Sequence, residues 1–208
     1  TAAMALAAIG SGPAVGAQAA GPGGSDPAAT RFVVRIENAS KPSTLKLSSG
    51  GAAAMPLSPG VWAVHTAGNP MLTPGQVDPG RGLKGLAEAG MAKEFDANLE
   101  GLGGVRSHGA FEKPFAPLIR IGGMNPRKAM PAAGGDASAS REPASRMLQP
   151  GHYFEFTVEA QPGDWLSLAM MIAQSNDGLL ATGARGMALF DASGRPVTGD
   201  VTAQLFLW

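Results

Sequence analysis

Four side chains of this sequence have a type and a position that could support chemistry: Asp177, His65, His108 and Trp62. Asp177 stands in the polar segment Ser-Asn-Asp-Gly, which follows the largely apolar residues 165–173 after one glutamine. A carboxylate held just beyond a rigid strand can serve as a Ca²⁺ ligand. The same residue types also form simple turns that bind nothing. The sequence thus leaves a metal ligand and an ordinary turn residue as alternatives for Asp177.

His65 lies in residues 58–66, a segment that opens with a Pro-Gly turn signal and then alternates like a strand. Its imidazole could act as a metal ligand or as a general base. The alternative is a histidine that is hydrogen-bonded inside a sheet or at its edge. The chain has two other histidines, His108 and His152, and all three are too far apart in the sequence for their spacing to define a site.

The element that must position Asp177 is a strand over residues 165–172. Leu166, Leu168 and Met170 fall on one face of an extended chain, and the residues between them are also largely apolar. A strand that is apolar on both faces is typical of the centre of a sheet that is covered on two sides. We therefore expect a central, fully covered strand that ends at the Asp177 turn.

Further strands are predicted where apolar and polar residues alternate, and two short helices where apolar residues recur every three or four positions. The predicted strands cover residues 31–37, 45–47, 58–66, 153–160 and 201–208, with an edge strand in 111–121, and the predicted helices cover 82–90 and 95–102. Gly90 is expected to separate the helices.

The connections complete the predicted fold. Residues 161–164 and 191–195 have the length and composition of hairpin loops. Residues 38–40 match an N-glycosylation acceptor and are interpreted as a turn. Residues 124–147 are expected to form a long surface insert. The fold class predicted is mainly β, an antiparallel β-sandwich with two short helices and a long surface insert.

Composition excludes several classes of function. Sixteen basic and sixteen acidic residues cancel, so no overall field attracts nucleic acid or an anionic membrane. The chain has no cysteine, which excludes disulfides, thiolate catalysis and zinc–thiolate sites. It also has no glycine-rich phosphate loop before a helix, no G-x-S-x-G motif and no closely spaced His/Glu motif. We predict a protein that is not an enzyme and has no nucleic-acid partner.

The first residues predict an exported protein. Residues 2–9 are apolar and uncharged, and Ala-Gln-Ala at 17–19 fits a signal-peptidase site. The run is too short to span a bilayer, so no transmembrane segment is expected. The predicted organisation is a partial signal peptide over 1–19, a linker over 20–30 and one domain over 31–208, with periplasmic, cell-surface or extracellular localisation. Neither end carries a start or stop signal, so we expect the domain to be truncated at its C-terminus.

Five segments occur in an order that resembles a known family. They are Ser-Pro-Gly-Val-Trp-Ala-Val-His-Thr at 58–66, Gly-Leu-Lys-Gly-Leu-Ala-Glu-Ala-Gly at 82–90, Leu-Gln-Pro-Gly at 148–151, Pro-Gly-Asp-x-Leu-Ser at 162–167 and Ser-Asn-Asp at 175–177. In this order they resemble the spondin N-terminal domain family, in its bacterial, exported branch. The resemblance covers residues 30–208.

The resemblance implies a fold and a metal site. Animal members of the family are matrix and cell-adhesion proteins whose domain is a β-sandwich with a bound Ca²⁺. One family carboxylate lies in the loop after the central strand, and Asp177 matches it. The others follow the tryptophan of a Trp-Asp-Ala-Gly-Thr-Asp/Glu segment, which Trp208 matches. The resemblance thus implies a partial calcium site in this chain, further ligands after Trp208, and an extracellular protein or glycan as partner.

Three alternatives remain open from the sequence. Trp62, His65 and His108 resemble in type the Trp and two His of copper(I) sites in some methanotroph surface proteins, and imidazole suits copper. An enzyme with His65 as base near Asp177 would need a nucleophile and an oxyanion site, and the sequence shows neither. The third alternative is a sandwich without a ligand, in which Asp177 only completes a turn.

Overall fold

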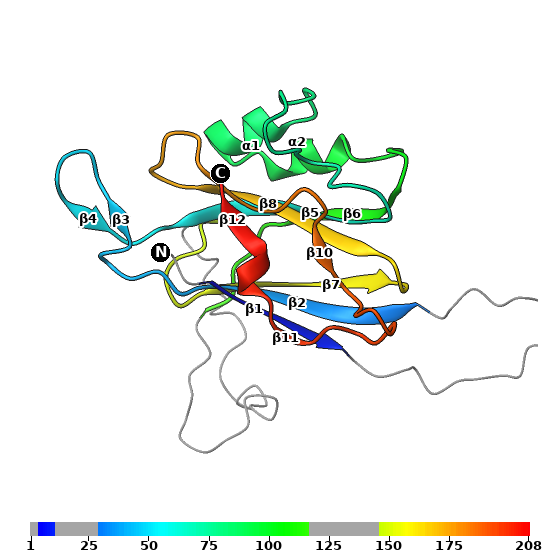
Figure 1. The fold of residues 1–208 in the computed structure, drawn as a ribbon. Coiled ribbons are helices and arrows are strands. Elements are labelled where there is room, and N and C mark those ends of the chain that lie inside the picture. Colours follow the sequence, from blue (N-terminus) through cyan, green and yellow to red (C-terminus); the bar gives the residue numbers. More distant parts are fainter. Residues whose placement is uncertain (1–3, 11–28, 117–145) are drawn as a thin grey trace, which may run out of the picture.

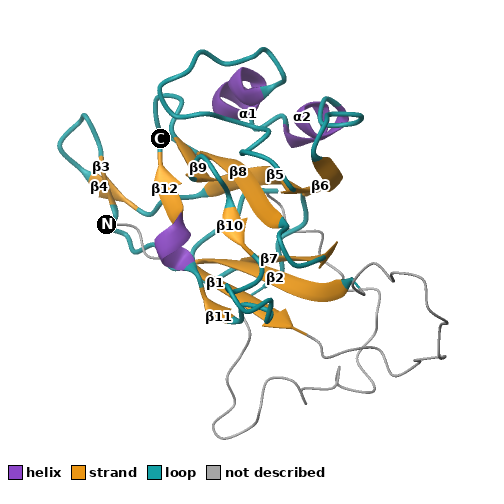
Figure 2. Cartoon of the chain, turned by 45° about the vertical axis from the view of Figure 1, so that its right-hand side comes forward, coloured by secondary structure: helices purple, strands orange, loops and turns teal. Residues whose placement is uncertain are grey.

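The computed structural model describes residues 4–10, 29–116 and 146–208. Two antiparallel sheets lie face to face, and a third layer of two helices covers the outer face of one of them (Figure 1). The same three layers are visible after rotation in Figure 2. The prediction of a mainly β, antiparallel sandwich with two short helices is confirmed. The predicted insert over 124–147 lies almost wholly outside the described residues.

The first sheet has the strand order β11–β1–β2–β7, with every neighbouring pair antiparallel. Its strands are β1 (Met4–Gly10), β2 (Thr30–Asn38), β7 (Tyr153–Ala160) and β11 (Gly199–Asp200). The predicted strand over 31–37 is confirmed as β2, whose alternation buries Phe32, Val34 and Ile36 and leaves the residues between them more exposed.

The second sheet has the order β12–β9–β8–β5–β6, with β10 also paired to β8. Its strands are β5 (Leu57–His65), β6 (Val105–Phe111), β8 (Trp165–Ile172), β9 (Leu179–Thr182), β10 (Met187–Ala188) and β12 (Leu205–Leu207). A 3₁₀ turn, η2 (Thr202–Gln204), leads into β12, so the predicted strand over 201–208 is shorter than expected. The predicted strand over 45–47 is reduced to β3 (Leu45–Lys46), which pairs only with β4 (Ala52–Ala53).

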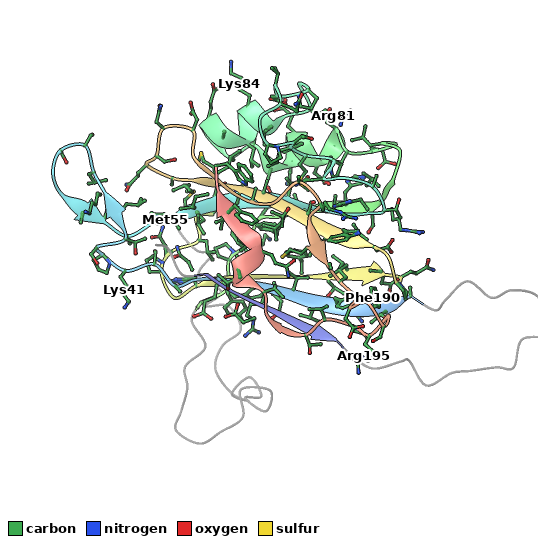
Figure 3. The ribbon with its side chains drawn as sticks, viewed as in Figure 1. Lys41, Met55, Arg81, Lys84, Phe190 and Arg195 are labelled. Atoms are coloured by element: carbon green, nitrogen blue, oxygen red, sulfur yellow. The ribbon has the colours of Figure 1, made fainter. Side chains whose placement is uncertain are left out.

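The larger core lies between the two sheets. Phe32 and Phe190 meet edge to face there with ring centroids 5.3 Å apart, and Phe111 stacks on Phe156 at 5.2 Å. Met55 and Phe190 mark opposite ends of this core in the view of Figure 3. Since β2 and β7 supply one wall and β5 and β8 the other, this core holds the sandwich together.

A second core lies between the second sheet and the helices α1 (Leu83–Ala89) and α2 (Ala92–Ala97). Leu86 and Phe95 point from the helices onto Val61 and Ala169 of the sheet. Gly90 ends α1 in the left-handed region at φ 65°, which permits the sharp break between the helices that the sequence predicted. The predicted second helix over 95–102 begins earlier and ends at Ala97.

The central strand β8 lies as predicted, with β5 and β9 on its two sides and both faces covered. Its side chains alternate between the two cores, with Leu166, Leu168 and Met170 in the first and Ala169 in the second. Strand β5 does the same with Val64 in the first core and Val61 in the second. These two strands are therefore common walls of both cores.

One expectation about the connections is wrong. Residues 161–164 do not close a hairpin, because β7 lies in the first sheet and β8 in the second. The turn that carries the chain between sheets is held by Asp164, whose Oδ2 accepts a 2.7 Å bond from Gln161 N. The edge strand expected in 111–121 is not tested, because Leu118, Ile119 and Ile121 lie outside the described residues. The edge of the second sheet is formed by β6, which ends at Phe111.

The beginning of the chain also differs from expectation. Folded structure was expected from Arg31, yet β1 (Met4–Gly10) pairs along its length with β2, from Met4 opposite Asn38 to Gly10 opposite Phe32. The segment interpreted as part of a signal peptide therefore also completes a ladder of the first sheet. The prediction of a signal peptide over residues 1–19 is not tested by this pairing.

Candidate functional site

The Asp177 turn connects β8 to β9 at the end of the second sheet. Its side-chain hydrogen bonds come from Ser175, whose Oγ donates to Ile172 O at 2.6 Å and accepts from Gly178 N at 2.9 Å. Asp177 itself is exposed and has φ 58°, a left-handed conformation that aspartate adopts more readily than most residues. Because Ser175 closes the turn, the Asp177 carboxylate is not needed for that purpose.

The end of β12 lies beside this turn. Trp208 exchanges two backbone hydrogen bonds with Leu179, from Leu179 N to Trp208 O at 3.1 Å and from Trp208 N to Leu179 O at 2.9 Å. Leu205, Phe206 and Leu207 pair with the following residues of β9 in antiparallel register. The direction of β12 therefore leads past Leu179 towards Gly178 and Asp177.

His65 is buried, with 1% of its surface exposed, and both of its ring nitrogens have partners. Nδ1 lies 2.8 Å from Ala67 O, which can only accept, so Nδ1 carries the proton. Nε2 then accepts from Ser167 Oγ at 2.8 Å. A Ser–His pair of this kind can in principle generate a nucleophile.

The surroundings of this pair give it a structural role. Ser167 has no exposed surface, and a Cβ added to Gly186 would lie 2.8 Å from Ser167 Oγ and 3.0 Å from His65 Nε2. The backbone of Gly186 thus covers the pair directly, so that a substrate could not reach Ser167 Oγ. Of the two interpretations that the sequence left open, His65 therefore fits a histidine that is hydrogen-bonded within the sheet.

The pKa of His65 is lowered by burial, which outweighs the opposite effects of the Ala67 hydrogen bond and the Asp164 charge. Below pH 6.5 the unfolded chain takes up a proton that the folded chain does not, so the stability that His65 contributes above pH 6.5 is lost as the pH falls below that value. We expect the free energy of unfolding to fall more between about pH 7.5 and about pH 5.5 in the wild type than in His65→Gln, by urea denaturation.

Thr66→Ser is the control for this experiment, because Thr66 is the exposed neighbour of His65 in the sequence and does not titrate. It should show the same pH dependence as the wild type. An equal loss of stability on acidification in the wild type and in His65→Gln would show that His65 is not held neutral in the folded state.

The three residues of the copper alternative do not come together. Trp62 lies on the side of β5 that faces the first sheet and stacks on Phe156 with ring centroids 5.6 Å apart. Ala63, on the opposite face, is the register partner of His108. His65 is committed to Ser167 and Ala67. This geometry does not support a shared copper site.

His108 has two carboxylate partners that the sequence analysis did not connect with it. Nδ1 lies 2.6 Å from Asp96 Oδ1 on α2, and Nε2 lies 2.9 Å from Glu100 Oε2, in the segment that follows α2. Burial acts to lower the pKa of His108, but the hydrogen bonds and charges of Asp96 and Glu100 outweigh it, and the pKa is raised. A signal was present in the sequence, because Asp96 and Glu100 are four residues apart, the spacing of one helix face.

No group of three or more His, Cys, Asp or Glu side chains that could hold a metal ion occurs within residues 4–10, 29–116 and 146–208. Asp96 and Glu100 lie on opposite nitrogens of His108, so they cannot reach one ion together. Among the same residues, no helix has the length and apolar character needed to cross a membrane.

Comparison of the chain with protein-family models, with curated proteins and with solved structures gave no match.

Proposed function

We propose that this chain is part of an exported, spondin-like binding module that binds Ca²⁺ at the Asp177 turn and serves extracellular or cell-surface interaction. The antiparallel sandwich is the fold that the resemblance implies. The turn after the central strand presents Asp177 to solvent, while Ser175 supplies the hydrogen bonds that close it. Both features support the proposal.

The observation that carries it is the pairing of Trp208 with Leu179. Continued in the same register, an antiparallel ladder would set the residue after Trp208 opposite Gly178 and the next one opposite Asp177. The resemblance implies an acidic segment at these positions. Its carboxylates would then lie next to the Asp177 carboxylate, which the sequence separates from them by about thirty residues.

Coordination chemistry explains why Asp177 needs these partners. Ca²⁺ takes about six to eight oxygen ligands, usually with several carboxylates among them. Asp177 supplies two oxygens at most, and no described group of three acidic or histidine side chains supplements it. We therefore expect residues 1–208 alone to bind Ca²⁺ weakly or not at all.

The test compares the 208-residue chain with the same chain extended by the residues encoded directly after Trp208. Calorimetry should show one calcium site in the extended chain, and its Tm should rise with Ca²⁺ and fall again with EDTA, because the ligand binds only the folded state. Asp177→Asn should abolish both effects in the extended chain. Asn176→Ala, in the same turn but without loss of a carboxylate, is the matched control and should retain both effects.

Two outcomes would contradict the calcium proposal. Tight binding by the 208 residues alone would show that the site does not depend on ligands after Trp208. An extended chain whose Tm ignores Ca²⁺ and EDTA would favour a sandwich without a ligand, in which Asp177 is only a turn residue.

A further inference from the structure

His108 connects the edge strand β6 to the helical layer through both nitrogens of its ring. Nδ1 lies 2.6 Å from Asp96 Oδ1 on α2, a helix that lies beside β6 in Figure 2, and Nε2 lies 2.9 Å from Glu100 Oε2. On the neighbouring strand β5, the register partner of His108 is Ala63, which carries no charge. The ring is therefore held between two carboxylates, one at each nitrogen.

The number of protons on the ring decides whether both contacts can exist. An ionised carboxylate only accepts hydrogen bonds, and imidazole has two N–H donors when it is protonated but one when it is neutral. The protonated ring of His108 thus satisfies both partners. In the neutral ring, one nitrogen would present a lone pair to a carboxylate oxygen within 3 Å, where two acceptors repel each other. Loss of one proton must therefore release one carboxylate.

Glu100 is the carboxylate that can leave. Its side chain is 82% exposed, so water can replace the hydrogen bond that it loses. The Asp96 side chain is only 28% exposed and its bond to Nδ1 is the shorter of the two. A neutral His108 ring therefore keeps its proton on Nδ1, next to Asp96, and loses the proton on Nε2.

The segment that carries Glu100 is a turn between α2 and β6, over residues 100–103. Its far end is fixed, because Gly104 O accepts a hydrogen bond from Thr66 N at 2.9 Å. Within it, Leu102 packs against the helical core, and Gly101 has φ 71°, a conformation that glycine adopts without steric cost. The link from Glu100 to His108 ties the beginning of this turn to β6.

We propose that His108 is a proton-operated switch, in which the protonated ring ties Glu100 and its turn to β6 and the neutral ring releases them. Asp96 is a positioning residue that fixes the ring in both states. After release, the turn keeps the packing of Leu102 but loses its link to the strand, so the mobility of Gly101 should increase.

The direction of the switch follows from the surroundings of the ring. Burial lowers the pKa of His108, but the hydrogen bonds and charges of Asp96 and Glu100 outweigh it, and the pKa is raised above 6.5. The tied state is therefore complete below pH 6.5 and is lost as the pH rises through the raised pKa. This direction is opposite to that of His65, whose contribution is lost on acidification.

Two cations near His108 already have carboxylate partners of their own. Lys93 on α2 pairs with Glu112 across 2.9 Å. Arg106, two residues before His108 on β6, pairs with the buried carboxylate of Asp164 across 2.7 Å. Both pairs offset the positive charge that would otherwise disfavour a protonated ring at this position.

The test follows the ring and the turn separately by NMR between about pH 5.5 and about pH 9, a window that spans the transition. Long-range ¹H–¹⁵N spectra should show both nitrogens of His108 protonated at the acidic end, a midpoint above pH 6.5, and loss of the Nε2 proton. The order parameter of Gly101, measured at Cα because this carbon does not exchange with water, should fall from about 0.85 towards about 0.6 with the same midpoint.

Glu100→Gln should separate the two effects. The midpoint of His108 should fall, because the variant removes one of the charges that raise it. The turn should remain ordered over the whole range, since a neutral amide can accept from the protonated ring and donate to the neutral one. Each unit by which the midpoint falls corresponds to about a tenfold change in the ratio of tied to released Glu100 in the wild type.

Glu88→Gln is the matched control, since Glu88 is a half-exposed carboxylate on α1 that pairs with Lys84 and not with His108. It should reproduce the wild-type midpoint and the wild-type change at Gly101. Near-UV circular dichroism checks that each variant is folded.

Three outcomes would overturn the proposal. The first is a wild-type midpoint at or below pH 6.5, which would mean that the carboxylates do not favour the protonated ring. The second is a Gly101 order parameter that stays constant while His108 titrates. The third is a change at Gly101 that persists in folded His108→Gln, since another group would then control the turn.

Discussion

Replacing Phe95 with alanine is expected to lower the free energy of unfolding by about 3–5 kcal/mol, as for other fully buried phenylalanines. Phe95 has no exposed surface and lies at the centre of the core between α2 and the second sheet. Gly82 also packs closely on this residue, since a Cβ added there would lie 3.0 Å from Phe95 Cα and 3.3 Å from Phe95 Cγ. Removing the ring should leave a cavity in this core, which sets the cost at this level.

Urea denaturation measures this change, and Lys93→Ala is its control on the same helix. The Lys93 side chain is 72% exposed and pairs with Glu112 across 2.9 Å, so its loss should cost about 0–1 kcal/mol. If Phe95→Ala were no more costly than Lys93→Ala, the helical layer would not be packed on the sheet as described.

Asn38→Ala is expected to cost about 3 kcal/mol, because it leaves several buried backbone groups without partners. The Asn38 side chain is fully buried at the end of β2. Its Nδ2 donates to Met55 O and to Leu148 O, both at 2.8 Å, and its Oδ1 accepts from Ser40 N at 2.9 Å. Alanine removes all three bonds in a place that water does not reach.

The same denaturation experiment on Asn98→Ala provides the comparison. Asn98 is an exposed asparagine whose Nδ2 donates to Arg81 O at 3.1 Å, so water can replace its bond. The expected change is below about 1 kcal/mol. A similar loss for both asparagines would mean that water reaches the Asn38 amide in the folded protein.

The elements that the sequence predicted well are those whose burial depends on local alternation. Strand β2 has one buried face and β8 has two, and both patterns are visible without knowledge of the partners. The break at Gly90 was predictable for a similar reason, since glycine favours the left-handed end of a helix.

The strands that sequence reasoning missed depend on tertiary context. Strand β9 is four residues long and wholly buried, too short for a period to be measured. Strand β6 contains the consecutive polar residues Arg106, Ser107 and His108, so it shows no apolar alternation there. Arg106 and His108 find charged partners in Asp164, Asp96 and Glu100. Asp164 is distant from this strand in the sequence, and the pairing of Asp96 and Glu100 with His108 was not predicted. The β-propensity of the residues alone therefore does not indicate the strand.

The candidate sites also combine features that the local sequence predicts with features that depend on tertiary structure. The turn at Asp177 was predictable from Ser175 and Gly178, whose types define it. The proximity of Trp208 was not, because it follows from the β9–β12 register. His65 was predicted as either a ligand or a sheet histidine, and only the burial of Ser167 beneath Gly186 distinguishes the two.

The position of β5 and β8 as walls of both cores has a consequence for how the domain loses its structure. Opening either core exposes side chains of strands that the other core also needs, so partial unfolding of one layer should weaken the next. Amide hydrogens of Val64 and Leu168 should therefore exchange only through global unfolding and share one protection free energy. The helices, which contact one core alone, can open at lower cost.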